Sequence, residues 1–175
     1  MCGWRKCLVA WIDFGAPRSV RGVIVESDDM GLGTREIVIS SAPSLSASGI
    51  SAAWGHDRFL VVWSDTRLGN PDIFATLVKP HGALPDPDGF PIATGPETEI
   101  QPALAYNGSR VLATWSRLTP ERFSVRGNFV RADSPLASPD GFVLSGASPM
   151  GRTSSSTVPH PSSRSPPSRS SSAPA

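Results

Sequence analysis

The sequence is short of the residues that build most catalytic and metal-binding sites. Its 175 residues include two cysteines, three histidines and one tyrosine. Charged residues make up 18% of the chain and hydrophobic residues 39%, and both shares are low for a compact globular domain. The formal net charge of +1 is too small to favour a nucleic-acid partner. We therefore expect no nucleic-acid binding.

Long apolar segments are also missing. No stretch approaches the roughly 18–20 residues that a transmembrane helix needs, so we expect no transmembrane segment. The apolar run from Cys7 to Ile12 has six residues, whereas a signal-peptide core needs about 7–15. We expect no export signal in this chain.

Turn-forming residues are abundant instead. The 16 glycines and 18 prolines suit many short strands joined by tight turns. Residues 150–175 are rich in serine, proline and arginine and hold almost no apolar side chain beyond Val158. Because such a segment cannot bury enough surface to fold, we expect a disordered tail. It is either a linker or an out-of-frame translation of a GC-rich gene.

A repeat of about 52 residues runs through the rest of the chain. Its landmarks at this step are Leu8, Leu60 and Leu112; Trp11, Trp63 and Trp115; Trp54 and Tyr106; and Asp88-Gly89-Phe90 with Asp140-Gly141-Phe142. Because several independent landmarks agree, the sequence predicts three copies, at about residues 3–54, 55–106 and 107–149.

The second copy predicts four short strands. Residues 58–65 are apolar on both alternating faces, which is typical of a strand buried on both sides. Residues 72–79 and 100–106 predict two further strands. Residues 90–93 predict an outer strand, because Pro91 cannot donate to a ladder.

Two turn signals separate these strands. In Asp86-Pro87-Asp88-Gly89 the proline presets φ, the aspartate caps its own backbone and the glycine accepts a positive φ. Asn107-Gly108 lies between two apolar runs, which is the strongest short-range signal for a β-hairpin.

Four antiparallel strands in about 40–50 residues match the size of one β-propeller blade. We therefore predict an all-β fold of three tandem four-stranded antiparallel repeats, which resemble propeller blades. A stacked β-solenoid and a β-sandwich are the alternatives. Since propellers typically have 4–8 blades, we expect an incomplete ring, interrupted at both ends, that exposes blade edges and faces.

The best-formed copy resembles a known repeat. The segment from Leu60 to Phe74, LVVWSDTRLGNPDIF, together with Gly82, Leu84 and Ile92, is similar to the LVVWxDxRxGxxDI units of large bacterial proteins. These secreted or surface-anchored proteins are typical of myxobacteria and are similar in outline to sialidase-like propellers.

The resemblance covers about residues 3–149 and is strongest in the second copy. The first copy has Asp13 with no arginine two residues later, and the third has Arg117 in place of Asp65. The resemblance implies an extracellular setting and a binding or structural role, and it implies no activity.

Two groups of polar residues are candidate sites with a plainer structural interpretation. Asp65, Arg67 and Asp72 could form a polar site at a blade edge, but the first two are more typical of residues that cap a turn. Asp86 and Asp88 could bind calcium, but two carboxylates are too few. We favour the structural interpretation of both groups.

The classes of residue that perform catalysis are poorly placed. Tyr106 could be the nucleophile of a sialidase-like enzyme, but it takes the place of Trp54 and is better explained by packing. His56, His81 and His160 fall in turns or in the tail, outside any zinc or triad motif. We assign no catalytic residue, no cofactor-binding residue and no metal ligand.

The two cysteines flank a four-residue hairpin loop. Cys2 aligns with Trp54, and Cys7 with Phe59, so the cysteines face each other in the predicted register. A cross-strand disulfide is geometrically possible and would fit an oxidising compartment. Of the two states, we expect a pair of buried free thiols.

The sequence thus predicts a non-enzymatic repeat segment of a secreted or cell-surface protein, which binds or scaffolds a glycan, a polymer or a protein. We expect no cofactor. One alternative is a fragment of a sialidase-like or other hydrolase propeller whose catalytic residues lie outside this chain. Another is a truncated or frameshifted reading frame without a function of its own.

Overall fold

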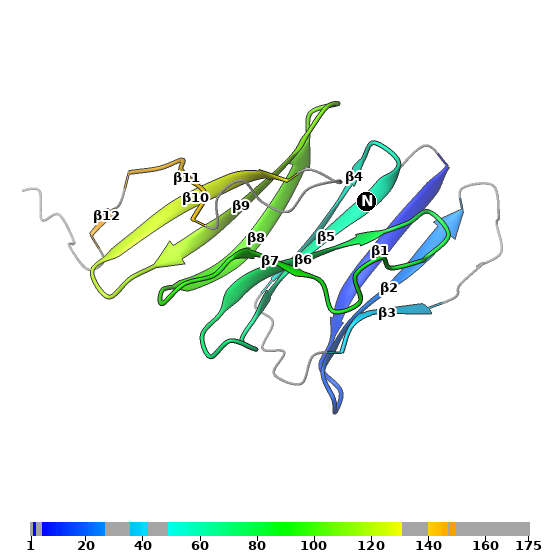
Figure 1. The fold of residues 1–175 in the computed structure, drawn as a ribbon, viewed down its shortest axis with the longest axis horizontal. Helices are drawn as coiled ribbons and strands as arrows, with labels where there is room; N and C mark the ends of the chain where they lie inside the picture. Colours follow the sequence, from blue (N-terminus) through cyan, green and yellow to red (C-terminus); the bar gives the residue numbers. More distant parts are fainter. Residues whose placement is uncertain are drawn as a thin grey trace, which may run out of the picture.

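The computed structural model consists of three antiparallel sheets (Figure 1). It describes residue 2 and residues 5–26, 36–41, 49–130, 140–146 and 148–149. These residues include no α-helix, which confirms the all-β class. None of the described segments has the helical length and apolar character that a membrane crossing needs. The predicted tail, residues 150–175, lies outside the described residues.

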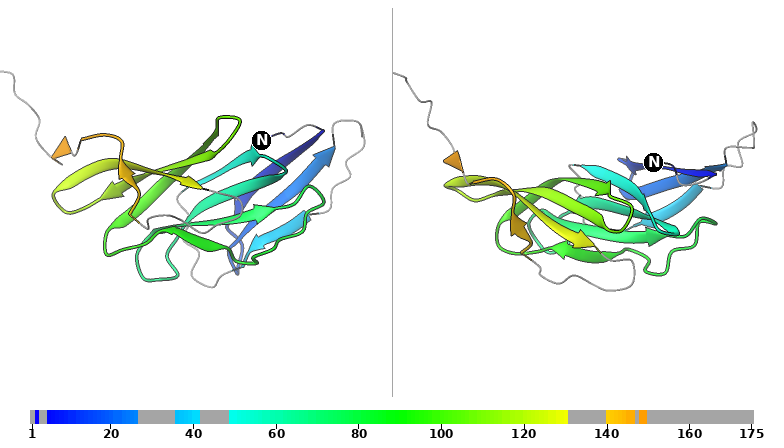
Figure 2. Two further views of the ribbon diagram at one scale, coloured as in Figure 1. Left: turned by 45° about the horizontal axis from the view of Figure 1, so that its top comes forward. Right: turned by 90° about the horizontal axis from the view of Figure 1, so that it is seen from above.

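The strands of each sheet follow the order of the chain, except that the last strand of the C-terminal sheet pairs with an earlier strand, and Figures 1 and 2 show the three sheets side by side. The N-terminal sheet contains β1 (Lys6–Asp13), β2 (Ser19–Glu26) and β3 (Glu36–Ser40). The central sheet contains β4 (Ile50–Gly55), β5 (Arg58–Asp65), β6 (Asp72–Val78) and β7 (Phe90–Ala93). The C-terminal sheet contains β8 (Thr98–Tyr106), β9 (Val111–Leu118), β10 (Arg122–Val130), β11 (Phe142–Val143) and β12 (Ser148–Pro149).

The strands predicted in the second copy are confirmed to within two residues. β5 and β7 have the predicted bounds, β6 ends one residue early, and β8 begins two residues early. β7 lies at the edge of its sheet, as Pro91 requires. Seven of the eight residues of β5 are buried, so this strand is covered on both faces.

The two faces of each sheet have different partners. We name the side that carries Leu8, Leu60 or Leu112 the leucine face, and the side that carries Trp11, Trp63 or Trp115 the tryptophan face. The leucine face of the N-terminal sheet packs against the tryptophan face of the central sheet. The leucine face of the central sheet packs in turn against the tryptophan face of the C-terminal sheet. The same pairing of faces therefore occurs twice.

The glycine of each Asp-Gly-Phe turn lies against a tryptophan ring. A Cβ on Gly89 would lie 2.7 Å from Cη2 of Trp63, and one on Gly141 would lie 2.5 Å from Cη2 of Trp115. Both glycines have positive φ, 75° and 59°. Only glycine satisfies both demands, so the turn and the ring fit together in the same way in two sheets.

The two cysteines form a disulfide, and the prediction of buried free thiols is wrong. The predicted register is confirmed, because Cys2 pairs with Cys7 as Trp54 pairs with Phe59. Cys2 is exposed, and residues opposite each other on antiparallel strands have close Cβ atoms. Cys2 is therefore not covered by packing, as a buried thiol would be, and the strand register brings the sulfur atoms of Cys2 and Cys7 together.

Candidate functional site

Each sheet has an arginine–carboxylate pair beside its tryptophan. The N-terminal sheet pairs Asp13 with Arg21 at 2.8 Å. The central sheet pairs Asp65 with Arg67. The C-terminal sheet pairs Arg117 with Glu99 at 2.8 Å. Asp13, Asp65 and Arg117 occupy the same position at a 52-residue step, so the pair persists although the charge at that position is reversed.

In the central sheet, Asp65 organises the turn that follows β5. Its fully buried carboxylate accepts hydrogen bonds from Trp63 Nε1 at 3.2 Å and from the backbone N–H of Arg67 at 2.9 Å. The Arg67 guanidinium lies over the ring of Phe74, 4.1 Å from its centroid, and donates to the carbonyl oxygen of Asp88 at 2.9 Å. Asp65 therefore caps the turn after β5 as predicted, whereas the carbonyl oxygen that Arg67 caps belongs to the β6–β7 turn and not to its own.

The same residues join the central sheet to the N-terminal sheet. Arg67 donates to Ser40 Oγ at 3.3 Å. Asp88 accepts from Ser40 Oγ at 3.1 Å and from the backbone N–H of Ser41 at 2.8 Å. The Asp86–Gly89 turn forms as predicted, but the Asp88 carboxylate binds the neighbouring sheet and not its own backbone. The described residues hold no group of three or more His, Cys, Asp or Glu side chains able to bind a metal.

In the C-terminal sheet, Arg117 replaces the aspartate. It is only 6% exposed, and its second ion pair, to Asp140, measures 3.1 Å. Arg126 donates to the carbonyl oxygen of Asp140 at 2.8 Å, as Arg67 does to Asp88. The substitution has a consequence for Trp115, whose buried Nε1 finds no hydrogen-bond acceptor in the part of the chain that the structure describes.

Two buried carboxyl groups meet between the central and C-terminal sheets. Glu99 is fully buried and Asp72 is 1% exposed. Burial, opposed by the charge of Arg117 and aided by that of Asp72, raises the pKa of Glu99 to about 7. Burial also raises the pKa of Asp72, against the hydrogen bond from the Gly95 N–H and the interaction with the neighbouring Glu99 carboxyl group.

The carboxyl oxygens of this pair have few donors. Asp72 Oδ2 and both carboxyl oxygens of Glu99 have no hydrogen bond from the described residues. A proton held by Glu99 and donated to Asp72 would satisfy two of these oxygens and remove one buried charge. We interpret Asp72 and Glu99 as a pair that shares a proton near neutral pH.

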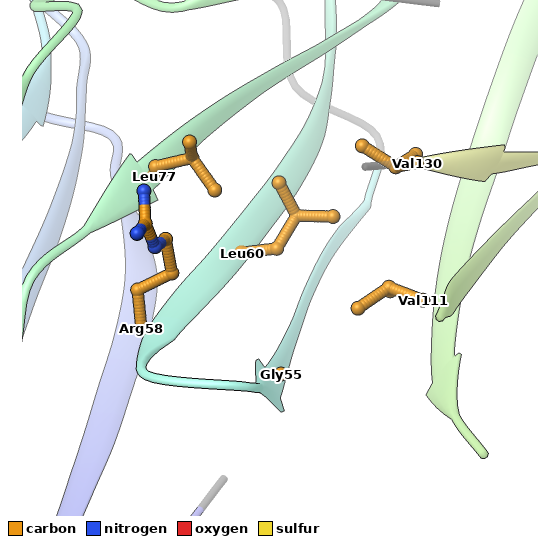
Figure 3. Close-up of a pocket in the computed structure, with 6 residues that line it drawn as sticks. All are labelled: Gly55, Arg58, Leu60, Leu77, Val111 and Val130. Carbon is orange, nitrogen blue, oxygen red and sulfur yellow. The ribbon is translucent and has the colours of Figure 1, made fainter. Parts of the chain in front are cut away.

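Two spaces beside the C-terminal sheet differ in what they can hold. A hollow of about 490 Å³ is lined by Pro96, Glu97, Thr98, Leu118, Thr119 and Pro120. Figure 3 shows a second space, where Leu60 and Leu77 of the central sheet face Val111 and Val130 of the C-terminal sheet. Its volume of about 20 Å³ fits no more than about one water molecule, so it is a packing gap.

The other candidate residues lie apart from the ion pairs. Tyr106 packs against the core between the central and C-terminal sheets, and its hydroxyl donates to the carbonyl oxygen of Gly108 at 2.8 Å. These contacts are those of a packing residue. His56 lies in the exposed β4–β5 turn, and His81 is exposed in the loop after β6. His160 lies outside the described residues.

Sequence reasoning missed Glu99 and Arg21 as members of these pairs, and Arg126 as the donor to the carbonyl oxygen of Asp140. Glu99 falls just before the predicted strand 100–106, and the structure extends that strand to include it. Arg21 and Arg126 lie opposite Trp11 and Trp115 in the strand register. Pairing the predicted strands residue by residue would have placed both arginines beside the tryptophans.

Comparison with protein-family models, with curated proteins and with solved structures finds no match to this chain. The role of the site is therefore inferred from the contacts and charges of its own residues. Buried arginine–carboxylate pairs hold turns and neighbouring sheets together, and one carboxyl pair can gain or lose a proton near neutral pH.

Proposed function

We propose that the chain is a non-enzymatic segment of propeller-like repeats, which serves a secreted or cell-surface protein as a scaffold with a ligand-binding surface. The observation that carries this proposal is that the buried ionisable residues are paired with one another. Asp65 and Glu99 are fully buried and Arg117 nearly so, and their partners come from the same or the adjacent turn and strand. Charged groups used in this way support a structural role.

The pairing of faces supports the blade interpretation. A two-sheet β-sandwich leaves the outer face of each sheet polar and solvated. Here the central sheet is covered on both sides by sheets that use the same pair of faces. The strands β1–β3, β4–β7 and β8–β11 are also meanders in chain order, which is the arrangement within a propeller blade, and β12 departs from it by pairing with β10.

The disulfide supports the extracellular setting. Disulfides persist in oxidising compartments and are rare in reducing ones. The bond between Cys2 and Cys7 joins an exposed residue to a half-buried one, so it would be open to reducing agents. A secreted or cell-surface protein is the setting in which such a bond lasts.

The hollow beside the C-terminal sheet is the best place for a ligand. It combines the carboxylate of Glu97 and the hydroxyl group of Thr98 with the rings of Pro96 and Pro120, whereas the Thr119 hydroxyl is hydrogen-bonded to the backbone of Arg122. Carboxylate and hydroxyl oxygens accept hydrogen bonds from sugar hydroxyls, and the proline rings offer apolar contact to a sugar ring. A glycan is therefore the ligand class that we favour.

A panel of glycans and cell-wall polymers tests this function. We expect the full chain to bind a member of the panel and Glu97→Gln with Thr98→Ala to weaken that binding at least about tenfold. Asp86→Asn, an exposed turn carboxylate of the central sheet, is the matched control and should bind normally. A natively folded chain that binds no member of the panel would contradict the proposal.

A hydrolase propeller whose catalytic residues lie outside this chain is the second candidate. It is favoured by one arginine beside the tryptophan of each sheet, Arg21, Arg67 and Arg117, because a sialidase-like site needs several arginines. Each of these is already paired with a carboxylate, which weakens this candidate. Neighbouring gene sequence that supplies further arginines and catalytic carboxylates would favour it. A frameshift correction that restores a fourth repeat after Pro149 would favour a reading frame without function.

A further inference from the structure

The leucine face of the C-terminal sheet is apolar and lacks a neighbouring sheet among the described residues. In the central sheet the corresponding face carries Leu60 and Leu77, which are 3% and 8% exposed beneath the C-terminal sheet. A step of 52 residues places Leu112 and Phe129 in the same two positions. Phe129 is 39% exposed, and Phe142, which contacts its ring at 5.9 Å between centroids, is 42% exposed.

Among the described residues, the tryptophan face of the N-terminal sheet is the complementary surface without a neighbour. It carries Val9, 50% exposed, two residues before Trp11 on β1, and Val38, 48% exposed, on β3. Arg21 of β2 lies between Trp11 and Val38 in the strand register. In the central sheet the residue that corresponds to Val9 is Val61, which is fully buried beneath the N-terminal sheet. Three charged groups form one network on this face, because Arg21 contacts both Asp13 and Glu36.

These two faces are of the kinds that pack against each other twice inside the molecule. We propose that two copies of this chain associate head to tail, with the leucine face of each C-terminal sheet on the tryptophan face of the partner's N-terminal sheet. The proposal rests on the blade stacking described under the proposed function. A two-fold axis satisfies both contacts at once and gives six sheets, within the range of about 4–8 blades that propellers have.

A second copy fits better than a partner of another kind. The two faces are different surface patches, so neither packs against a second copy of itself. Each can pack against the other face on an identical chain, which is a heterologous interface. Each face has an apolar side chain at a position that is apolar and buried in the internal interfaces. Val9 corresponds to Val61, and Phe129 corresponds to Leu77. A chain with one such face would need another protein, whereas a chain with both needs only its own copy.

Light scattering on the full chain after size-exclusion chromatography tests the proposal. We expect a mass of twice 18.5 kDa that falls to one chain on dilution. Val9→Asp and Phe129→Asp should each weaken dimerisation at least about 100-fold, because each buries an unpaired charge in both contacts. Leu68→Asp, on an apolar residue that is 61% exposed in the β5–β6 turn, should leave the dimer intact.

Mixing the two variants separates this arrangement from others. The Val9→Asp chain keeps its leucine face and the Phe129→Asp chain keeps its tryptophan face, so together they form one unaltered contact. We expect the mixture to recover a heterodimer that neither variant forms alone. A wild-type chain that stays monomeric at its highest soluble concentration, larger species that grow with concentration, or a mixture without heterodimer would each overturn the closed dimer.

Amide exchange distinguishes failure of the dimer from failure of the stacking. Slow exchange of β5 and β6 in every variant shows that the three sheets remain stacked, and the mass then decides the dimer alone. Fast exchange of β5 in the monomeric wild type would contradict the blade stacking itself. If Val9→Asp does not fold, Val38→Asp on the same exposed face replaces it, with the same expected mass.

Discussion

The interface on one side of the central sheet differs from the interface on the other in how charge is handled. On the N-terminal side, Asp65 and Arg67 satisfy each other within one turn and reach Ser40 across the interface. On the C-terminal side, Glu99 and Arg117 come from two strands, and Glu99 also meets Asp72 of the central sheet. The apolar pairing of faces is the same on both sides.

This difference shows that an arginine–carboxylate pair recurs at the same place in each sheet, although the sequence positions that supply its two residues differ. Arg117 stands where the other copies have aspartate, and the opposite charge is supplied by a neighbouring strand. The exchange has costs: Trp115 Nε1 loses its acceptor and a carboxyl group is buried with a raised pKa. The C-terminal interface should therefore be the more sensitive of the two to pH.

The largest expected effect compares the same residue in a covered and an uncovered sheet. Trp63 is fully buried, whereas Trp11 on the outer face is half-buried. Trp63→Ala should lower the free energy of unfolding by about 5 kcal/mol, because it leaves a large cavity. Trp11→Ala should cost about 1 kcal/mol. Denaturant unfolding at low protein concentration measures both. Equal costs would mean that the outer face is covered even in the monomer.

The next comparison concerns the aspartates. Asp65→Ala removes a fully buried carboxylate and leaves the largely buried Arg67 cation without its main partner, which should cost about 4 kcal/mol. Asp13 has a side chain that is 35% exposed, and Arg21 retains Glu36 as a partner, so Asp13→Ala should cost less than about 1 kcal/mol. Thermal unfolding of both variants, with Asp57→Ala as an exposed control, checks the difference. A similar loss of stability from Asp65→Ala and Asp13→Ala would contradict the expected difference between the two aspartates.

The pH dependence of stability should report the carboxyl pair. Glu99 keeps its proton up to about pH 7 in the folded chain but loses it near pH 4.5 when unfolded. The folded chain therefore binds more protons in this window, and the free energy of unfolding falls as pH rises from about 4.5 to 7 and stays lower above. The expected loss from this group is on the order of 3 kcal/mol.

Two variants isolate this effect. Glu99→Gln resembles the protonated side chain and should flatten the fall in stability between pH 4.5 and 7. Glu121→Gln, on an exposed carboxylate in the β9–β10 turn, should leave the fall unchanged. Denaturant unfolding at several pH values measures the slope. If Glu99→Gln keeps the wild-type slope, the shared proton lies elsewhere.

The smallest expected effect concerns the disulfide. The pair Cys2 and Cys7 occupies the position that Trp54 and Phe59 hold in the central sheet. Because it closes a loop with a sequence separation of only 5, replacing both cysteines by serine should cost about 2 kcal/mol. Amide exchange should rise in β1 and remain unchanged in β5. Reduction of the wild type should reproduce this pattern, and an equal rise in β5 would show that the sheets unfold together.

Much of the fold could be predicted because its signals are local. β5 was predictable from an apolar run on both faces, and β7 from the proline that excludes it from the middle of a sheet. The Asn107-Gly108 hairpin and the Asp86–Gly89 turn depend on backbone preferences of a few adjacent residues, and Gly89 and Gly108 have the expected positive φ.

The candidate site was harder to predict because its partners are distant in sequence. The capping role of Asp65 could be predicted, since its partner Arg67 is two residues away. The meeting of Glu99 with Asp72, and of Asp88 with Ser40, depends on how two sheets stack. For the disulfide, the partners were predicted correctly from the strand register, but the chemical state of the two cysteines was not.

The sequence by itself determined the β class, the strand bounds of the second copy and the positions that recur in each copy. These follow from the two-residue period of strands and from the φ preferences of proline and glycine, which act within a few residues. Only the tertiary structure decided which charged groups meet, which faces of the sheets are covered and which carboxyl keeps a proton. Those outcomes depend on burial and on contacts between sheets, and desolvation of a charge exists only once the sheets have packed.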